Sequence, residues 1–177
     1  MKQFQPLISA ALAVTIVFTA CSSGASDKET TATTEVAPTT TTATNTADAN
    51  QQKLEENKKL VSDFLQSFFG DKDTTAIDKY LADNIIQHSP LLHDTKQGFK
   101  EDTRPYYSRP NLPKTKVDIK QIAAEGDKVW TMVRDVAPNG KVFARMDIFK
   151  VENGKITEHW SVEQAEPKES DNKNTMF

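Results

Sequence analysis

Two residues near the end of the chain, Asp147 and His159, could together carry out acid–base chemistry. They lie on two runs of alternating side chains, which a turn at Asn153-Gly154 separates. An aspartate beside a histidine is a minimal acid–base pair, because the carboxylate can orient the imidazole and either group can move a proton on a substrate. Arg145, one pleat from Asp147, could keep that carboxyl group ionised or bind an anionic oxygen.

The register of this hairpin decides which side chains share a face. A two-residue loop at Asn153-Gly154 would place Asp147 opposite Trp160 and turn His159 to the other face. A type I turn with a left-handed Gly154 would instead place Asp147 opposite His159. We favour the second register because it segregates polar from apolar side chains. Its polar face carries Phe143, Arg145, Asp147, Phe149, Thr157, His159, Ser161 and Glu163. Its other face carries Val142, Ala144, Met146, Ile148, Ile156, Trp160 and Val162.

The helical half of the chain could complete a pocket around this face. His88 and Tyr80 could close over the same site, while Phe143 and Phe149 would supply the apolar walls that small-molecule pockets usually have. The alternative is a polar cluster without chemistry, since an arginine and an aspartate two residues apart on a strand often form a surface ion pair. The spacing leaves both interpretations open.

Other classes of site lack their sequence signals. The histidines at positions 88, 93 and 159, even with Asp147, match no recognised metal-ligand motif, and we predict neither a metal nor another cofactor. Gly-rich phosphate loops are absent, and no Gly-x-Ser-x-Gly motif predicts a serine hydrolase. The whole chain has a net charge of -3, of which residues 1–21 contribute +1 and residues 22–51 contribute -3, so residues 52–177 carry -1. A domain without a basic surplus is not expected to bind nucleic acid, and we predict no nucleic-acid partner.

The elements that must position these residues follow from the hydrophobic periodicity. Apolar residues at three- and four-residue spacing predict an amphipathic helix over 54–69, ending before Gly70, and shorter helices over 76–81 and 96–107, the last broken by Pro105. From Thr115 the period changes to two, and turn signals at short intervals predict an antiparallel meander of four strands. Helices followed by strands indicate an α+β domain over 52–177.

The beginning of the chain predicts its compartment. Lys2, an apolar run over 7–20 and then Cys21 with small residues after it resemble a bacterial lipoprotein signal, with residues 1–20 removed and Cys21 lipidated. An ordinary secretory signal or an uncleaved anchor is the alternative; the run of 14 residues is short for a spanning helix, which needs about 20. Residues 21–51, rich in threonine and alanine, predict a disordered tether. We therefore expect a domain anchored by lipid at the cell envelope, on the outer membrane or the cell surface.

Several segments of the domain resemble SnoaL-like proteins. The segments are Ile-Ile-Gln-His-Ser-Pro at 85–90, the strand and turn at 146–156, and Glu-His-Trp-Ser-Val at 158–162; the ending 172–177 resembles a subgroup of predicted SnoaL-like aldol-condensation enzymes. The resemblance implies a nuclear transport factor 2-like fold, a cone of helices packed in the hollow of a strongly curved antiparallel sheet. It also implies a pocket inside the cone and pairing of two copies through the sheet.

The same resemblance implies a chemistry. Relatives include polyketide cyclases that close a ring by aldol condensation, with an acid–base residue and no metal or organic cofactor, and Arg145-x-Asp147 is similar to the Arg/Asp arrangement of limonene epoxide hydrolases. The subgroup usually has aspartate where this chain has Ser161, so chemistry here would depend on Asp147 as base, His159 as partner or acid, and His88 with Arg145 at the carbonyl oxygen. We expect a pocket for a small apolar ligand, with aldol, cyclase or isomerase chemistry, or else a non-catalytic ligand- or protein-binding domain.

Overall fold

The computed structural model describes the backbone of residues 41–177 and the side chains of residues 46–177. The predicted signal peptide, Cys21 and the first part of the predicted tether lie outside the described residues. Helix α1 (Thr41–Leu65) begins inside the segment that we predicted as disordered. Hydrogen bonds from Gln51 to Glu55 and from Gln52 to Glu56 span one turn of this helix, and such i,i+4 pairs support an exposed helix. The tether prediction is therefore wrong for residues 41–51.

Three further helical segments and one strand complete the helical half. A π-helical segment η1 (Gln66–Gly70) continues α1, followed by α2 (Ala76–Tyr80), strand β1 (Leu81–Gln87) and α3 (Thr95–Tyr107). Helix α3 runs through Pro105 rather than breaking there. Proline removes one hydrogen-bond donor, and the helix continues for only two residues, with the Ser108 amide closing the end onto the Arg104 carbonyl.

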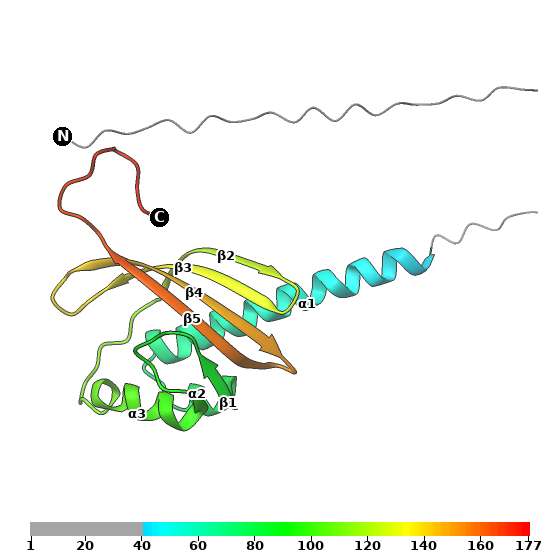
Figure 1. Ribbon diagram of the computed structural model, residues 1–177, viewed down its shortest axis with the longest axis horizontal. Helices are drawn as coiled ribbons and strands as arrows, with labels where there is room; N and C mark the ends of the chain where they lie inside the picture. Colours follow the sequence, from blue (N-terminus) through cyan, green and yellow to red (C-terminus); the bar gives the residue numbers. More distant parts are fainter. Residues whose placement is uncertain (1–40) are drawn as a thin grey trace, which may run out of the picture. The chain divides into compact units, whose positions relative to one another are not determined.

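The sheet has five strands in the order β1-β5-β4-β3-β2. Strands β2 (Asp118–Glu125), β3 (Lys128–Val136), β4 (Val142–Glu152) and β5 (Lys155–Ala165) form the antiparallel meander that the sequence predicts. Strand β1 adds to the edge of β5 in parallel. The helices α1, α2 and α3 lie on one side of the sheet, which curves over them, so the α+β prediction is confirmed (Figure 1).

The hairpin between β4 and β5 starts in the first of the two registers considered from the sequence and then shifts to a third one. Asn153 and Gly154 both have positive φ, 50° and 71°, as a two-residue type I′ loop requires, and Val151 pairs with Ile156. The register then shifts by one residue, so Lys150 pairs with Glu158 and Asp147 with Ser161. Our predicted pairing of Asp147 with His159 is wrong, because a bulge follows the tight turn.

The bulge nevertheless places most side chains on the predicted faces. We call the face toward the helices the inner face; Asp147 and Phe149 lie on it and are buried, and Ser161 contacts Asp147 there. On the opposite outer face, Met146 and Val162 are 44% and 69% exposed. Ile156 is the exception: it precedes the shift and is fully buried on the inner face, not the outer one.

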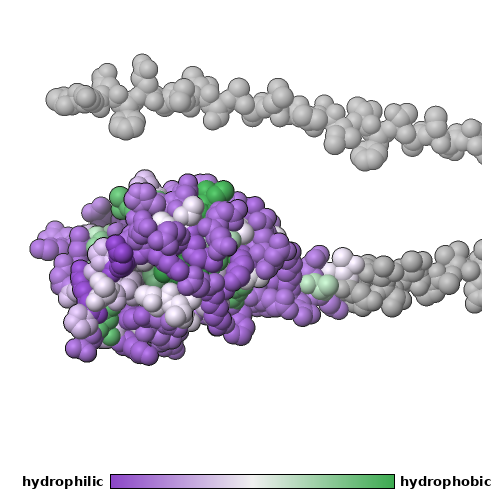
Figure 2. Space-filling view, turned by 90° about the horizontal axis from the view of Figure 1, so that it is seen from below, coloured by the Kyte–Doolittle hydropathy of each residue, from purple (hydrophilic) through white to green (hydrophobic). Residues whose placement is uncertain are grey.

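The core lies between the inner face and the helices. Its buried side chains come from every helix and from strands β1, β3, β4 and β5: Val61, Phe64, Leu65, Phe68, Ala76, Ile77, Tyr80, Leu81, Ile85, Phe99, Val129, Val133, Phe149, Val151 and Ile156. Viewed from the side of α2, β1 and α3, the surface is mostly hydrophilic (Figure 2). The apolar faces that periodicity predicted are thus turned inward, which is the main stabilising term for the fold.

Candidate functional site

A buried polar cluster occupies the inner face of β4 and β5. Asp147 is its centre and is only 3% exposed. Ser161 Oγ donates a hydrogen bond to Asp147 Oδ1 at 2.7 Å, and Arg145 Nε donates to Oδ2 at 3.0 Å. His159 Nε2 lies 3.4 Å from Oδ1, which is a longer contact. The structure therefore brings together the Arg145, Asp147 and His159 that the sequence singled out.

Electrostatics hold this carboxyl group in its ionised form. Burial by itself raises the pKa of Asp147, but the hydrogen bond from His159, the positive charge of Arg145 and the hydrogen bond from Ser161 outweigh burial and lower that pKa below its ordinary value. Both carboxylate oxygens already accept hydrogen bonds. Asp147 is therefore suited to orient its neighbours rather than to take a proton from a substrate.

Arg145 links the cluster to the surface. Its guanidinium bonds a second carboxylate, with Nη1 2.8 Å from Asp135 Oδ2, and lies 4.6 Å from the centre of the Phe69 ring. Burial lowers the pKa of Arg145, yet the charges of Asp147 and Asp135 raise it overall, so the guanidinium remains charged. With two carboxylates on one arginine, this residue has little remaining capacity for a substrate anion.

His159 connects the cluster to an internal cavity. Its Nδ1 lies 2.8 Å from Gln87 Oε1, and its ring stacks on Phe149 with centres 4.8 Å apart and planes 15° apart. Strand β1 supplies Gln87 because Gln87 pairs with His159 in the parallel ladder. Neighbours in register on parallel strands point to the same face, so both side chains reach the inside of the cone.

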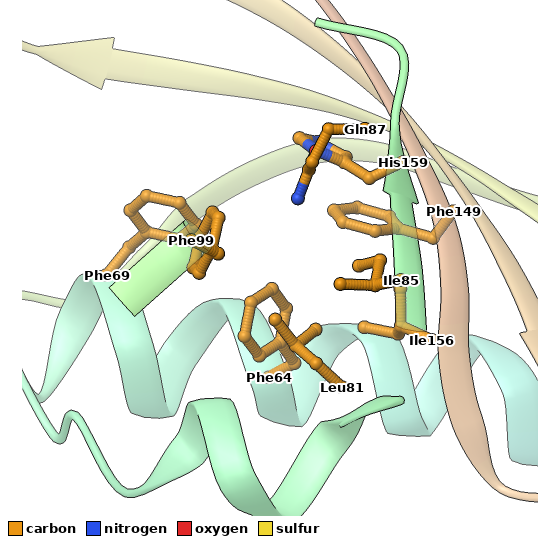
Figure 3. A pocket seen from close by; sticks show the side chains of 9 residues that line it. All are labelled: Phe64, Phe69, Leu81, Ile85, Gln87, Phe99, Phe149, Ile156 and His159. Carbon is orange, nitrogen blue, oxygen red and sulfur yellow. The ribbon is translucent and has the colours of Figure 1, made fainter. Parts of the chain in front are cut away.

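The cavity is small and mostly apolar. Its walls are Phe64, Phe69, Leu81, Ile85, Gln87, Phe99, Phe149, Ile156 and His159. Figure 3 shows Gln87 and His159 together at one end, with aromatic and aliphatic side chains around the rest. The cavity volume is about 10 Å³, about the space for a single water molecule. Asp147 is not among the walls, so only His159 presents the cluster to the cavity.

The other predicted site residues lie elsewhere. His88 follows Gln87 and so points outward: it stacks on Trp160 at 4.1 Å, and its Nε2 lies 3.0 Å from Glu158 on the outer face. Tyr80 is buried in the core against Phe64, outside the cavity walls. Phe143 lies near the far end of β4 under Lys141 and is also not a wall residue. Of the predicted apolar walls, only Phe149 lines the cavity.

Sequence reasoning missed two polar members of the site, Gln87 and Asp135, and the apolar cavity walls other than Phe149. Gln87 reaches His159 only because β1 adds to β5 in parallel, across 72 residues of chain. Asp135 reaches Arg145 from the neighbouring strand β3. The contact between Asp135 and Arg145 could have been predicted from the β3–β4 turn, because the two residues lie almost opposite each other in that hairpin. No local signal predicts the contact between Gln87 and His159.

The described residues contain neither a metal-ligand cluster nor a membrane-spanning helix. Among residues 46–177, no three histidine, cysteine, aspartate or glutamate side chains lie close enough together to hold a metal ion. In the same part of the chain, no helix combines the length and the apolar character that crossing a bilayer requires.

Comparison with known proteins identifies relatives of this domain. A model of the SnoaL-like domain matches residues 61–159. No curated protein matches the chain. Similar solved structures include nuclear transport factor 2-like proteins of unknown function from Burkholderia xenovorans (16% identity, 66% of this chain and 89% of that one, TM-score 0.54) and Mesorhizobium loti (16%, 63% and 93%, 0.53). A candidate polyketide cyclase from Bacillus cereus is 24% identical over 61% of this chain and 74% of that one, with a TM-score of 0.50. At these identities the structures share the fold alone.

Proposed function

Because the chain belongs to the SnoaL-like domain family, we propose that its cone binds a small, mostly apolar molecule whose one polar group accepts a hydrogen bond from the Gln87 amide nitrogen, which His159 holds in place. The observation that carries this proposal is the distribution of polarity in the cavity: two polar side chains at one end and apolar walls elsewhere. Ligand pockets typically have this pattern, in which apolar area supplies affinity and a few polar groups fix orientation.

The cavity must enlarge to accept such a ligand. A volume of about 10 Å³ holds one water molecule, so a wall side chain has to move. Phe99 is suited to this because it enters the cavity from α3, which lies outside the sheet and is covered by no further layer in Figure 1. The free energy that opens the cavity reduces the apparent affinity for the ligand. Because truncation of Phe99 opens the cavity in advance, we expect a variant with a shorter side chain at this position to bind the ligand more tightly.

A ligand screen with matched variants tests this proposal. Thermal unfolding of the full chain would be measured with small apolar alcohols, ketones and carboxylic acids, since a ligand raises the melting temperature by mass action. Compounds that stabilise the wild type should lose this effect in His159→Ala and keep it in His88→Ala, which removes a histidine from the outer face. Phe99→Ala should strengthen it. Equal responses of the two histidine variants would overturn the proposal.

Acid–base chemistry is the second candidate function, with the roles revised. His159 faces the cavity and Asp147 lies behind it at 3.4 Å, an order in which the carboxylate orients the imidazole and the imidazole moves the proton. Because both carboxylate oxygens of Asp147 already accept hydrogen bonds, binding is favoured over catalysis. Turnover of a bound carbonyl compound that is lost in His159→Gln, while binding persists, would establish the chemistry.

We also propose that the domain is anchored to the cell envelope through lipid on Cys21. The support is the sequence of the first 24 residues, with a short apolar run directly before the cysteine. The wild type expressed in a bacterium should partition into detergent, and its mature N-terminal peptide should carry the mass of acyl chains. Cys21→Ser should remove both properties. A wild-type chain that stays in the aqueous phase would contradict the anchor.

Pairing of two copies stays a prediction from the family resemblance. The outer face offers exposed apolar side chains, with Met146 and Val162 at 44% and 69% exposure. Light scattering of the full chain at several concentrations would give the mass. A dimer in the wild type that dissociates in Val162→Asp, but not in Leu91→Asp at an exposed loop position, would place the contact on the sheet.

A further inference from the structure

A second and larger hollow lies outside the cone, between α2 and α3. This α2–α3 cleft has a volume of about 400 Å³, within the range of small-molecule sites. Its floor includes Ile77, which is buried, and the partly buried ring of Tyr107. Thr74 and Ser108 supply hydroxyl groups at an exposed rim. The cleft is open to solvent, so a ligand can enter without any movement of the core.

The charged side chains of the cleft are arranged for an anion. Lys100 and Arg104 are one helical turn apart on α3 and therefore project to the same side. Lys100 Nζ lies 2.6 Å from Asp78 Oδ1, an ion pair across the cleft. Among residues 46–177 no carboxylate lies within ion-pair distance of the Arg104 guanidinium, which is exposed. Its five N–H donors are free to bind a carboxylate or phosphate.

The charges that line the cleft give it a positive balance. Lys100 and Arg104 are cationic and Asp78 is the one anionic residue among the lining side chains, which leaves one net positive charge. Long-range attraction of anions to such a surface raises the rate of encounter.

From these features we infer that the α2–α3 cleft binds a small hydroxylated organic anion, a sugar acid or sugar phosphate. The anionic group would bond to Arg104 and Lys100. The hydroxyl groups of the ligand would find acceptors and donors in Asp78, Thr74 and Ser108, and its carbon skeleton would lie on Ile77 and Tyr107. This site is independent of the proposed ligand in the cone, because none of its residues lines the cone cavity.

Calorimetric titration of the full chain at low ionic strength tests the inference. The probes are glucuronate, glucose 6-phosphate, glucose and inorganic phosphate. We expect one of the two sugar anions to bind, and its identity distinguishes carboxylate from phosphate. Glucose should bind at least about tenfold more weakly, since it lacks the charge-assisted hydrogen bonds. Glucose binding as tightly as the anions, inorganic phosphate binding as tightly as glucose 6-phosphate, or no binding of either sugar anion would overturn the inference.

Matched variants locate the site. Arg104→Gln should weaken binding at least about tenfold, whereas Lys53→Gln, which removes the same charge from exposed α1, should change it less than about twofold. Asp78→Asn should strengthen binding of the anion, because it frees Lys100 and removes a negative charge. His159→Ala should leave this binding unchanged, so failure here is distinguishable from failure of the cone proposal. Equal effects of Arg104→Gln and Lys53→Gln would exclude the cleft.

Discussion

The cone cavity and the α2–α3 cleft differ in how their polar groups are satisfied. In the cone, Asp147 has three partners and 3% exposure, and the adjoining space holds about one water molecule. In the cleft, an exposed arginine lacks a carboxylate partner among the described residues, and the space is about 400 Å³. A buried polar group without a hydrogen-bond partner destabilises the fold, so it must be paired within the protein. An exposed polar group is hydrated and can remain unpaired until a ligand binds. Polar residues of the cone therefore contribute first to stability, and those of the cleft are free for binding.

The largest expected effect tests whether Asp147 is structural. Asp147→Asn removes a buried charge beside Arg145 and should lower the free energy of unfolding by about 3–5 kcal/mol. Glu158→Gln is the control: it removes a carboxylate that also pairs with a histidine and a lysine, but on the outer face, and should cost less than about 1 kcal/mol. Urea unfolding measures both. Equal losses would remove the distinction between buried and exposed clusters.

A smaller effect comes from the position at which the related subgroup has aspartate. Ser161→Ala loses one hydrogen bond to a charged oxygen, at a cost of about 1.5–3 kcal/mol. Ser161→Asp places a second carboxylate against Asp147, which raises one folded-state pKa above its unfolded value. When the folded-state pKa of an acid lies above its unfolded value, the folded protein keeps its stability at low pH. It loses stability as the pH rises through the folded-state pKa. Unfolding of Ser161→Asp should thus become easier as the pH rises above about 4, with no such trend in Ser161→Ala.

Acid should act on the wild type in the opposite direction. The pKa of Asp147 in the folded state lies below its ordinary value, so this carboxylate contributes stability that is complete above the unfolded pKa of about 3.9 and is lost as the pH falls through the lower folded value. The wild type should lose stability below about pH 4. Asp147→Asn should lose less over the same interval. Parallel acid curves for the two proteins would show that other carboxyl groups dominate.

The smallest effect on stability should come from the cleft. Asp78→Asn breaks an exposed ion pair with Lys100 and should change the free energy of unfolding by less than about 0.5 kcal/mol. The same variant should strengthen anion binding. In the cleft, a substitution should therefore change binding with little effect on stability, whereas in the cone it should change both. Thermal unfolding beside the calorimetric titration would check both. A large loss of stability would show that the cleft is part of the structural framework.

Local patterns were sufficient for most of the fold. The three- and four-residue spacing from Leu54 predicted the second half of α1 together with η1. The change to period two after Thr115 predicted the four-strand meander, because these periods follow from the geometry of helix and strand. The inner and outer faces of β4 and β5 were also mostly predictable, because successive side chains on a strand point to opposite faces whichever residues they pair with. The exact partner of Asp147 was not, because the bulge at Thr157 shifts the register by one residue between the Val151–Ile156 and Lys150–Glu158 pairs, and no marked residue type signals it.

The sequence by itself determined the class of this protein: its helices, its meander, the polar residues 145, 147 and 159 on one face, and the family to which it belongs. The tertiary structure alone decided how those residues are used. Parallel pairing of β1 with β5 brought Gln87 inside and turned His88 outside, and packing of the helices left the cone almost full while opening a cleft between α2 and α3. Contacts between residues far apart in the chain depend on how whole elements pack, and no local spacing encodes that arrangement.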